Sequence, residues 1–395
     1  MNGIAQRARE LESEIRTHRR TIHSFAEIGF DLPQTTAYVL RTLKEYGYEP
    51  KMVGKAGITC TAGKPGKTFL LRADMDALPM EEKTGLEFAA TNGHCHSCGH
   101  DMHTAMLLGA AKILKENEDQ LAGTVKLMFQ PAEEILGGSQ DMIENGIMLN
   151  PRVDAAMAIH VMAGKNYSRC GDIICRDGCV ANSGDAVRIE VFGRDAHGSR
   201  PELGVDAIHI AAHILFALDE LTTREIPMDE ESIVLVGQIS GGTTCNSIPG
   251  SAVMELSVRT TGPKQREFLC RRIEELSMAV ASMYHGTAKV THVYGTPALV
   301  NNSDLLKDVV GYLKECYSEE YIQYGPAAGD KIGSEDFTRV AELVPSIFLQ
   351  LGVGSLAEGH EWSLHHPAVK MNEQALTIGT TALVQSASRW LEEHS

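Results

Sequence analysis

The amino-acid sequence predicts an α/β protein of two domains, with the second domain inserted into the first. The chain has 395 residues, a length that favours two domains. In its first half, short apolar runs alternate with helical stretches, a pattern typical of α/β folds. Between residues 185 and 295 the order changes to βαββαβ, which is the order of a ferredoxin-like domain.

The first predicted elements are two surface helices, in which apolar residues recur at helical spacing. Leu11 and Ile15 share a face of the first helix, and Val39 and Leu43 share a face of the second, after a turn signal at 31–33. A strand, a polar loop, a helix and two more strands follow, at 68–74, 92–101, 104–116, 124–132 and 155–161. These strands are almost continuously apolar, which predicts that both faces of their sheet are buried.

The inserted domain is predicted at residues 184–296, and the surrounding domain at 1–183 and 297–395. The insert consists of strands at 186–193, 232–240, 251–260 and 288–295, with helices at 205–221 and 265–283. A helix at 305–316, a strand at 346–354 and a closing helix at 373–391 then return to the first domain.

Composition excludes several classes of protein. With 43% hydrophobic and 22% charged residues, the chain is neither collagen-like nor wholly disordered. Its net charge of -16 repels phosphate backbones and anionic lipids, so neither nucleic acid nor a membrane surface is an expected partner. The sequence contains neither an apolar run of about 18 residues nor the apolar core of a signal peptide. We therefore expect a cytoplasmic protein, and its nine cysteines are expected to be thiols.

The densest group of reactive side chains lies in the loop before the third predicted helix. Six candidate metal ligands occur within ten residues: His94, Cys95, His96, Cys98, His100 and His103. One interpretation is a thiol-redox pair of Cys95 and Cys98 ahead of a helix. A structural zinc knuckle is a second, although no further ligand pair follows, and a polar surface loop is a third. The fourth is a catalytic metal site that takes its other ligands from distant strands.

Acids and imidazoles at the ends of other strands favour the catalytic metal site. Glu133 and Glu134 follow one apolar strand, and His160 lies near the end of the next, where α/β sheets gather their ligands. Two adjacent acids allow one to ligate a metal while the other acts as a general base. A surface Glu-Glu pair is the simpler alternative.

Two further segments offer supporting groups. At residues 365–366 two adjacent histidines precede a proline, and at most one of them can point into a site. Asp74 and Asp76 end another apolar strand, where they could orient a ligating imidazole or cap a turn.

Eight motifs along the chain resemble, in the same order, those of di-metal amidohydrolases related to hippurate hydrolase and plant auxin-conjugate hydrolases. This branch belongs to the wider aminoacylase and carboxypeptidase G family. The resemblance covers essentially the whole chain, and it implies that the inserted domain is a lid or dimerisation domain. The motifs are RADMDALPM, SCGHDMHTAMLLGAAKIL, MFQPAEE, AIHV, AHGSRPELGVDAI, NSIPG, GSEDF and LHHPAV.

The resemblance implies a role for each matching residue. Two divalent metal ions per subunit are expected, with zinc or manganese favoured over nickel or cobalt. Glu133 would be the general base, and His197 and Asn246 would be lid residues that reach the substrate. The family also suggests a homodimer through the lid domain, with a tetramer as the alternative. The implied metal ligands are Cys98, His100, Glu134, His160 and His365.

The expected reaction is hydrolysis of the amide bond of an N-acyl amino acid, of the hippurate or N-acetyl type, with dipeptides as an alternative substrate. His197 and the metal would stabilise the oxyanion. Arg259 is a candidate to bind the substrate carboxylate, and Gly333 and Ser334 could add backbone N–H donors. The competing hypotheses are a redox protein using Cys95 and Cys98 and a metal-binding protein without turnover.

Three departures from the family pattern border the expected cleft. Cys95 stands where methionine is common, Ala26 where proline is common, and Met162-Ala163 where Trp-Pro is common. The CxxC spacing can therefore arise from one substitution, and the other two changes affect substrate choice more than the reaction.

Overall fold

The computed structural model describes residues 3–228 and 230–395. The chain forms two compact units. The first comprises residues up to Val180, Val300–Asp330 and Asp336–Ser395, and the second comprises Ala181–Leu299 and Lys331–Glu335. The predicted domain boundaries lie within three residues of 181 and 299. That residues 331–335 join the second unit was not expected from the sequence.

The first unit is built on one mixed sheet of eight strands. Its central strands β4, β3, β5 and β16 run parallel and are buried along their length, which explains their continuous apolar sequences. In spatial order the strands are β1 (Lys51–Val53), β2 (Gly57–Gly63), β4 (Thr124–Gln130), β3 (Thr68–Asp74), β5 (Ala155–Met162), β16 (Ser346–Gly352), β6 (Ile173–Arg176) and β15 (Ile322–Gly325).

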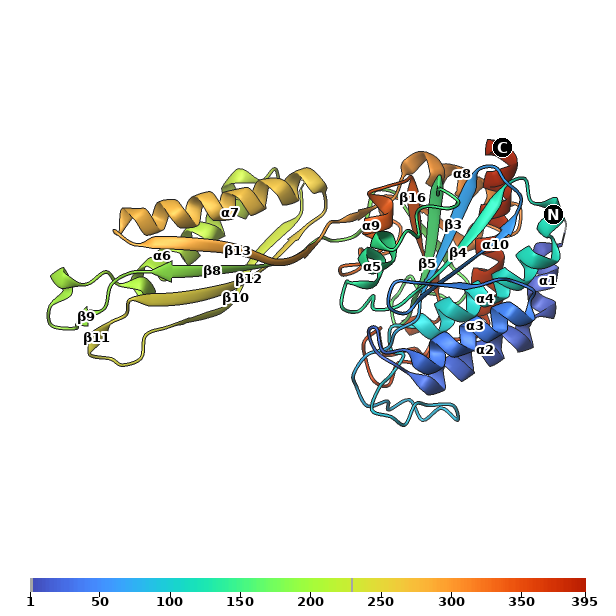
Figure 1. Ribbon diagram of the computed structural model, residues 1–395, viewed down its shortest axis with the longest axis horizontal. Helices are drawn as coiled ribbons and strands as arrows, with labels where there is room; N and C mark the ends of the chain where they lie inside the picture. Colours follow the sequence, from blue (N-terminus) through green and yellow to red (C-terminus); the bar gives the residue numbers. More distant parts are fainter. Residues whose placement is uncertain (1–2, 229) are drawn as a thin grey trace. The chain divides into compact units, whose positions relative to one another are not determined.

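Helices α4 and α10 pack together against this sheet, and α1, α2 and α3 pack around α4 (Figure 1). Helix α4 begins at His100, four residues earlier than the sequence predicts, so His100 and His103 lie in its first turn. The helices of this unit are α1 (Ile4–Glu10), α2 (Glu12–Phe25), α3 (Pro33–Glu45), α4 (His100–Glu116), α5 (Gly138–Glu144), α8 (Ser303–Lys314), α9 (Thr338–Ala341) and α10 (Ala375–His394).

The second unit is a four-stranded antiparallel sheet with helices α6 (Ala207–Glu220) and α7 (Pro263–Met283) on one face (Figure 1). Its strands, in spatial order, are β10 (Ser232–Gly241), β12 (Ser251–Thr260), β8 (Gly184–Phe192) and β13 (Thr287–Thr296). Alternate residues of β12 and β8 are buried against the helices. A short ribbon pairs β9 (Ala196–His197) with β11 (Ser247–Ile248). This βαββαβ order confirms the predicted fold class.

Across residues 3–228 and 230–395, we find no helix that combines the length and the apolar character needed to cross a bilayer.

Candidate metal centre

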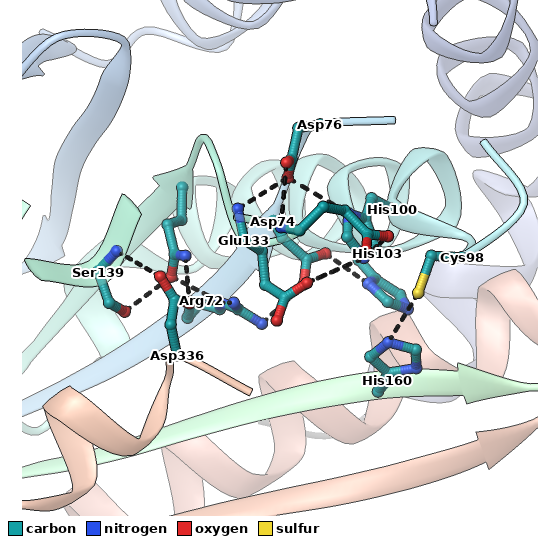
Figure 2. A network of polar contacts seen from close by, with 12 residues as sticks. Arg72, Asp74, Asp76, Cys98, His100, His103, Glu133, Ser139, His160 and Asp336 are labelled. Atoms are coloured by element: carbon teal, nitrogen blue, oxygen red, sulfur yellow. Dashed lines mark hydrogen bonds and ion pairs between the residues drawn. The ribbon is translucent and has the colours of Figure 1, made fainter. Parts of the chain in front are cut away.

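The candidate centre lies where three parallel strands of the first unit end at the same edge of the sheet. Asp74 is the last residue of β3, Glu133 follows β4 by three residues, and His160 lies near the end of β5. His100 is the first residue of α4 and points toward the same place (Figure 2). The topology therefore brings together side chains that are far apart in the sequence.

Gly99 allows the loop before α4 to approach β5 closely. Its φ of +90° is in the left-handed region, which favours glycine. A Cβ atom there would lie 2.3 Å from Cγ2 of Val161. Glycine at this position thus places its neighbours Cys98 and His100 against the end of β5.

The Cys98 sulfur is the centre of the cluster. Its Sγ lies 3.4 Å from Nε2 of His160 and 3.3 Å from Nε2 of His365. The same nitrogen of His365 lies 3.5 Å from Oε1 of Glu134. Two sets of potential ligands, each within 4.8 Å of one another, share this sulfur: Cys98 with His100 and His160, and Cys98 with Glu134 and His365. The five predicted ligands are thus brought together around one thiol.

Several of these atoms have the character of metal ligands. Both ring nitrogens of His100 and Oε1 of Glu134 are buried and, in the described part of the chain, have ion-pair contacts of 3.4 Å or longer but no hydrogen bond. Buried polar atoms are normally satisfied, because leaving one unpaired costs about 1–3 kcal/mol. Sulfur, imidazole nitrogen and carboxylate oxygen together suit zinc, manganese and similar divalent ions. The residues therefore fit divalent metal ions, and Cys98 is common to two of the sets that would hold them.

His160 presents a lone pair to the cluster. Its Nδ1 lies 2.8 Å from the carbonyl oxygen of Val161. A carbonyl can only accept, so Nδ1 carries the proton and Nε2, which faces Cys98, does not. This is the tautomer that ligates a metal through Nε2.

Asp76 orients the adjacent glutamates. Its Oδ1 accepts the backbone N–H of Glu133 at 3.0 Å, and its Oδ2 accepts that of Glu134 at 3.2 Å. Its Oδ1 also lies 3.4 Å from Nδ1 of His100. Both acids approach His100, because Oε2 of Glu133 and Oε1 of Glu134 each lie 3.9 Å from its Nε2, and Glu134 also lies beside His365. Among the described candidate sets, Glu134 shares one with Cys98 and Glu133 does not, a difference that suits one ligand and one base.

Burial sets the protonation of the cluster. It raises the pKa of the Cys98 thiol well above its usual value and lowers the pKa of His160. Burial also opposes the charge on His100, but Asp74 and Cys98 outweigh it and raise the pKa of His100. Because a thiol ligates as the thiolate, an ion that binds here must displace protons.

The other predicted residues lie in the second unit, in two groups. His197 and Asn246 are exposed on the β9–β11 ribbon, where Gly198 N–H donates to the Asn246 carbonyl at 2.8 Å. The Nδ1 atom of His197 accepts the backbone N–H of Ser199 at 3.2 Å. Its proton is therefore on Nε2, which leaves His197 able to donate a hydrogen bond outward.

The second group is Arg259 with Ser334. Nη1 of Arg259 donates to Oγ of Ser334, and Gly333 is the preceding residue of the same segment. The guanidinium lies over Gly184, where a Cβ would come within 2.4 Å of Nη1. Glycine on β8 thus makes room for the arginine. The sequence offered both residues as substrate ligands but did not show that they touch.

One charged network behind the centre was not predicted. Oδ2 of Asp101 accepts from Nε of Arg19 at 3.0 Å and lies 2.9 Å from Nδ1 of His23. Nε2 of His23 lies 3.0 Å from Glu82. Arg19 and His23 are spaced i, i+4 on α2, and this spacing was the available signal.

This network makes stability depend on pH. Burial opposes the charge on His23, but Asp101 and Glu82 outweigh it and raise its pKa to about 9. Because the pKa of His23 is higher in the folded protein, its charge contributes its full stabilisation below the unfolded-state pKa of about 6.5. That contribution to the free energy of unfolding is lost as the pH rises through 9. We expect the stability advantage of the wild type over His23→Gln to shrink by about 3 kcal/mol between pH 6 and pH 10. Urea unfolding of both proteins across this range measures it, and a difference that stays constant with pH would contradict it.

A second unpredicted network includes Asp74 at the end of β3. Arg72 donates to Oδ2 of Asp74 at 2.7 Å and lies 3.3 Å from Oδ1 of Asp336 (Figure 2). Gln130 accepts from Arg72 at 2.9 Å and donates to the same oxygen of Asp336 at 2.6 Å. Ser139 N–H donates to the other oxygen of Asp336 at 2.9 Å. Charged residues in a buried strand require such partners, but the sequence did not identify them.

The geometry does not favour the redox interpretation. Cys95 is buried, and burial raises the pKa of its thiol to about 12, whereas redox-active thiols have lowered pKa values and some exposure. Its main chain pairs with Leu78, and Cys98 faces histidines. All nine cysteines are free thiols.

Fold and site together define a two-unit α/β protein with a candidate centre for divalent metal ions. Comparison with known proteins identifies the family. Residues 70–389 match peptidase family M20/M25/M40, and the chain belongs to it. The family resemblance noted in the sequence is therefore confirmed, and the protein is a metallo-hydrolase.

Three relatives illustrate the range of this family. The chain is 34% identical to an N-acetyl-L-cysteine deacetylase of Bacillus subtilis over 388 residues, which is 97% of this chain and 90% of the relative. It is 33% identical to the IAA-amino acid hydrolase ILR1-like 4 of Arabidopsis thaliana over 385 residues, covering 95% and 85%. A crystal structure of a dinuclear metal-binding M20 peptidase from Bacillus subtilis superposes with a TM-score of 0.83 at 28% identity, covering 97% and 99%.

Proposed function

We propose that this enzyme hydrolyses the amide bond of N-acyl amino acids, including N-acetyl and hippurate-type substrates, with Glu133 as the general base. The observation that carries the proposal is the pair of adjacent glutamates held by Asp76, both of which lie 3.9 Å from His100 while Glu134 also lies beside His365. Relatives named as an N-acetyl-L-cysteine deacetylase and an IAA-amino acid hydrolase support this substrate class.

Each residue of the site has a part in this reaction. Cys98, His100, Glu134, His160 and His365 would hold two divalent ions, with zinc or manganese favoured over nickel or cobalt. When bound, these ions polarise the scissile carbonyl and acidify the attacking water. Glu133 takes a proton from the water and delivers it to the leaving amine.

The second unit supplies the substrate ligands in this proposal. His197 donates its Nε2 proton to the developing oxyanion, and Asn246 beside it contacts the amide. Arg259 binds the carboxylate of the amino acid, with backbone N–H groups from Gly333 and Ser334. An acidic protein needs such a local positive group to bind an anionic substrate.

The first test is hydrolysis of N-acetyl and N-benzoyl amino acids and dipeptides by metal-stripped protein that is re-supplied with zinc or manganese. Metal-dependent release of the free amino acid is the expected result, and the panel ranks the acyl groups and tests the dipeptidase alternative. Fully metallated protein that is inactive on the whole panel would favour a metal-binding protein without turnover.

Arg259→Lys is expected to raise KM about 10–100-fold with a smaller change in kcat. Lysine keeps the charge but loses the bidentate contact with the carboxylate, and a charge-assisted hydrogen bond contributes about 1.5–3 kcal/mol. Steady-state kinetics on an N-acyl amino acid measure both constants. The matched control is Arg188→Lys, because Arg188 pairs with Glu255 on the same sheet. An equal KM change in both variants would contradict a specific role for Arg259.

We also infer a homodimer through the second unit, with a tetramer as the alternative, and a cytoplasmic location. The edge strand β10 has exposed Ile233, Leu235 and Ile239, which supports an association surface. A thiol at the ligand centre supports a reducing compartment. The net charge of -16 argues against nucleic acid or membrane partners. Light scattering of the purified protein tests the oligomeric state.

A further inference from the structure

His103 is a buried histidine beside the centre that the proposed reaction does not use. It lies one helical turn after His100 on α4, and 2% of its surface is exposed. Both of its ring nitrogens have partners, and neither partner is one of the five proposed ligands. Its surroundings, described below, connect it to His160.

The two partners determine which nitrogen of His103 carries the proton. The backbone N–H of Val161 donates to Nε2 at 2.8 Å. An amide N–H can only donate, so Nε2 holds a lone pair and the proton is on Nδ1. Nδ1 then donates to Oδ1 of Asp74 at 2.5 Å (Figure 2). His103 therefore joins a carboxylate to a main-chain amide.

Val161 is the residue whose carbonyl orients His160. The carbonyl accepts the Nδ1 proton of His160 at 2.8 Å, so that the other ring nitrogen faces Cys98. The pairing of β5 with β3 ends at Ala158, before Val161 is reached. His103 thus holds an amide at a position where β3 no longer pairs with β5.

Asp74, the carboxylate that binds His103, is also held in place. The second oxygen of Asp74 accepts from Nη1 of Arg72 at 2.7 Å, and Nη2 of Arg72 lies 3.3 Å from Asp336. All three side chains are buried. Because both oxygens of Asp74 are engaged, Asp74 presents Oδ1 to His103 in a single orientation.

We propose that His103 is a positioning residue that fixes the His160 ring through the main chain of Val161, with Asp74 setting its tautomer. This inference rests on the proposed function, because it requires His160 to be a metal ligand. The expected consequence is selective: the ion held by the group that contains His160 depends on His103, whereas the ion held by Glu134 and His365 depends on it less.

The test is metal titration of the full-length protein and its variants with Zn²⁺. His103→Leu is expected to weaken one of two binding events about 10–100-fold, the range typical of outer-shell partners. His103→Gln should restore most of that affinity, since its amide oxygen can accept from Val161 and its NH₂ can donate to Asp74. His18→Leu is the matched control, because it removes another buried histidine whose nitrogens both hydrogen-bond, to Tyr38 and Tyr46 at 2.7 Å.

A second measurement uses metal-free protein. Hydrogen exchange of the Val161 amide should be slow in the wild type and in His103→Gln, and faster in His103→Leu. If His103 only filled space, its replacement by leucine would leave the exchange rate of this amide unchanged. If His103→Leu fails to fold, His103→Met serves as the apolar variant, since methionine adapts to irregular space. Equal weakening of both ions, or a glutamine variant that behaves like leucine, would overturn the proposal.

His160→Ala separates the two ways in which the test can fail. Loss of one ion in His160→Ala with unchanged binding in His103→Leu would overturn only the positioning role. Unchanged metal binding in His160→Ala would remove His160 from the ligand set, and both the positioning role and the proposed ligand assignment would fall.

Discussion

Glu133→Gln is expected to lower kcat by about 10²–10⁴-fold, the contribution typical of a general base, while the protein retains its metal ions. Glutamine has nearly the same shape as glutamate, so it can keep the buried position and its main-chain hydrogen bond to Asp76. It cannot take a proton from water at neutral pH. Steady-state kinetics and metal content by elemental analysis measure the two outcomes.

The neighbouring acid provides the control for this experiment. Glu134→Gln should lose metal as well as activity, because Oε1 of Glu134 lies among the proposed ligands, 3.5 Å from His365. A Glu133→Gln variant with full activity would place the base elsewhere. Equal loss of metal in both variants would identify Glu133 as a ligand.

Cys98→Ala is expected to abolish high-affinity binding of both ions and reduce hydrolysis to the background rate. Both sets of potential ligands contain this sulfur, so its removal leaves each set with two protein ligands of the three. The loss of affinity should exceed the roughly 10–100-fold effect of an outer-shell substitution. Isothermal titration with Zn²⁺ measures the number of ions bound and their affinities.

Cys95→Ser is the matched control, since Cys95 is a buried thiol three residues away that faces no proposed ligand in the described contacts. It should keep both ions and its activity. If Cys95→Ser were inactive and Cys98→Ala still bound two ions, the thiol-redox hypothesis would be favoured over the metal centre.

Much of the fold could be predicted because its elements follow simple patterns. The central strands are apolar throughout because both faces of the sheet are covered. In β12 and β8, buried and less buried residues alternate because helices cover only one face of their sheet. The start of α4 was placed too late, since the polar residues His100, Asp101 and His103 hide the helical period although all three are buried. No local sequence pattern indicates that residues 331–335 belong to the second unit.

The candidate site was predicted in part, for reasons that depend on distance along the chain. Glu133, Glu134 and His160 could be inferred because they follow buried strands that end at one edge. The choice of Cys98 and His365 needed the family resemblance, since each is one of several similar neighbours. The contacts of His23 with Asp101 and of Arg72 with Asp336 join residues 78 and 264 positions apart, and no local pattern reports such pairings.

The two-segment make-up of the second unit has a consequence for the evolution and engineering of this enzyme. Residues 181–299 do not make up the whole second unit. Lys331 forms an ion pair with Glu231 at 2.7 Å, and Ser334 accepts a hydrogen bond from Arg259. Recombination that replaced only residues 181–299 would combine the sheet of a relative with this protein's own residues 331–335. Chimeras between relatives should therefore exchange both segments together. Among relatives, we expect position 231 to change together with 331, and position 259 together with 334, because these residues contact each other.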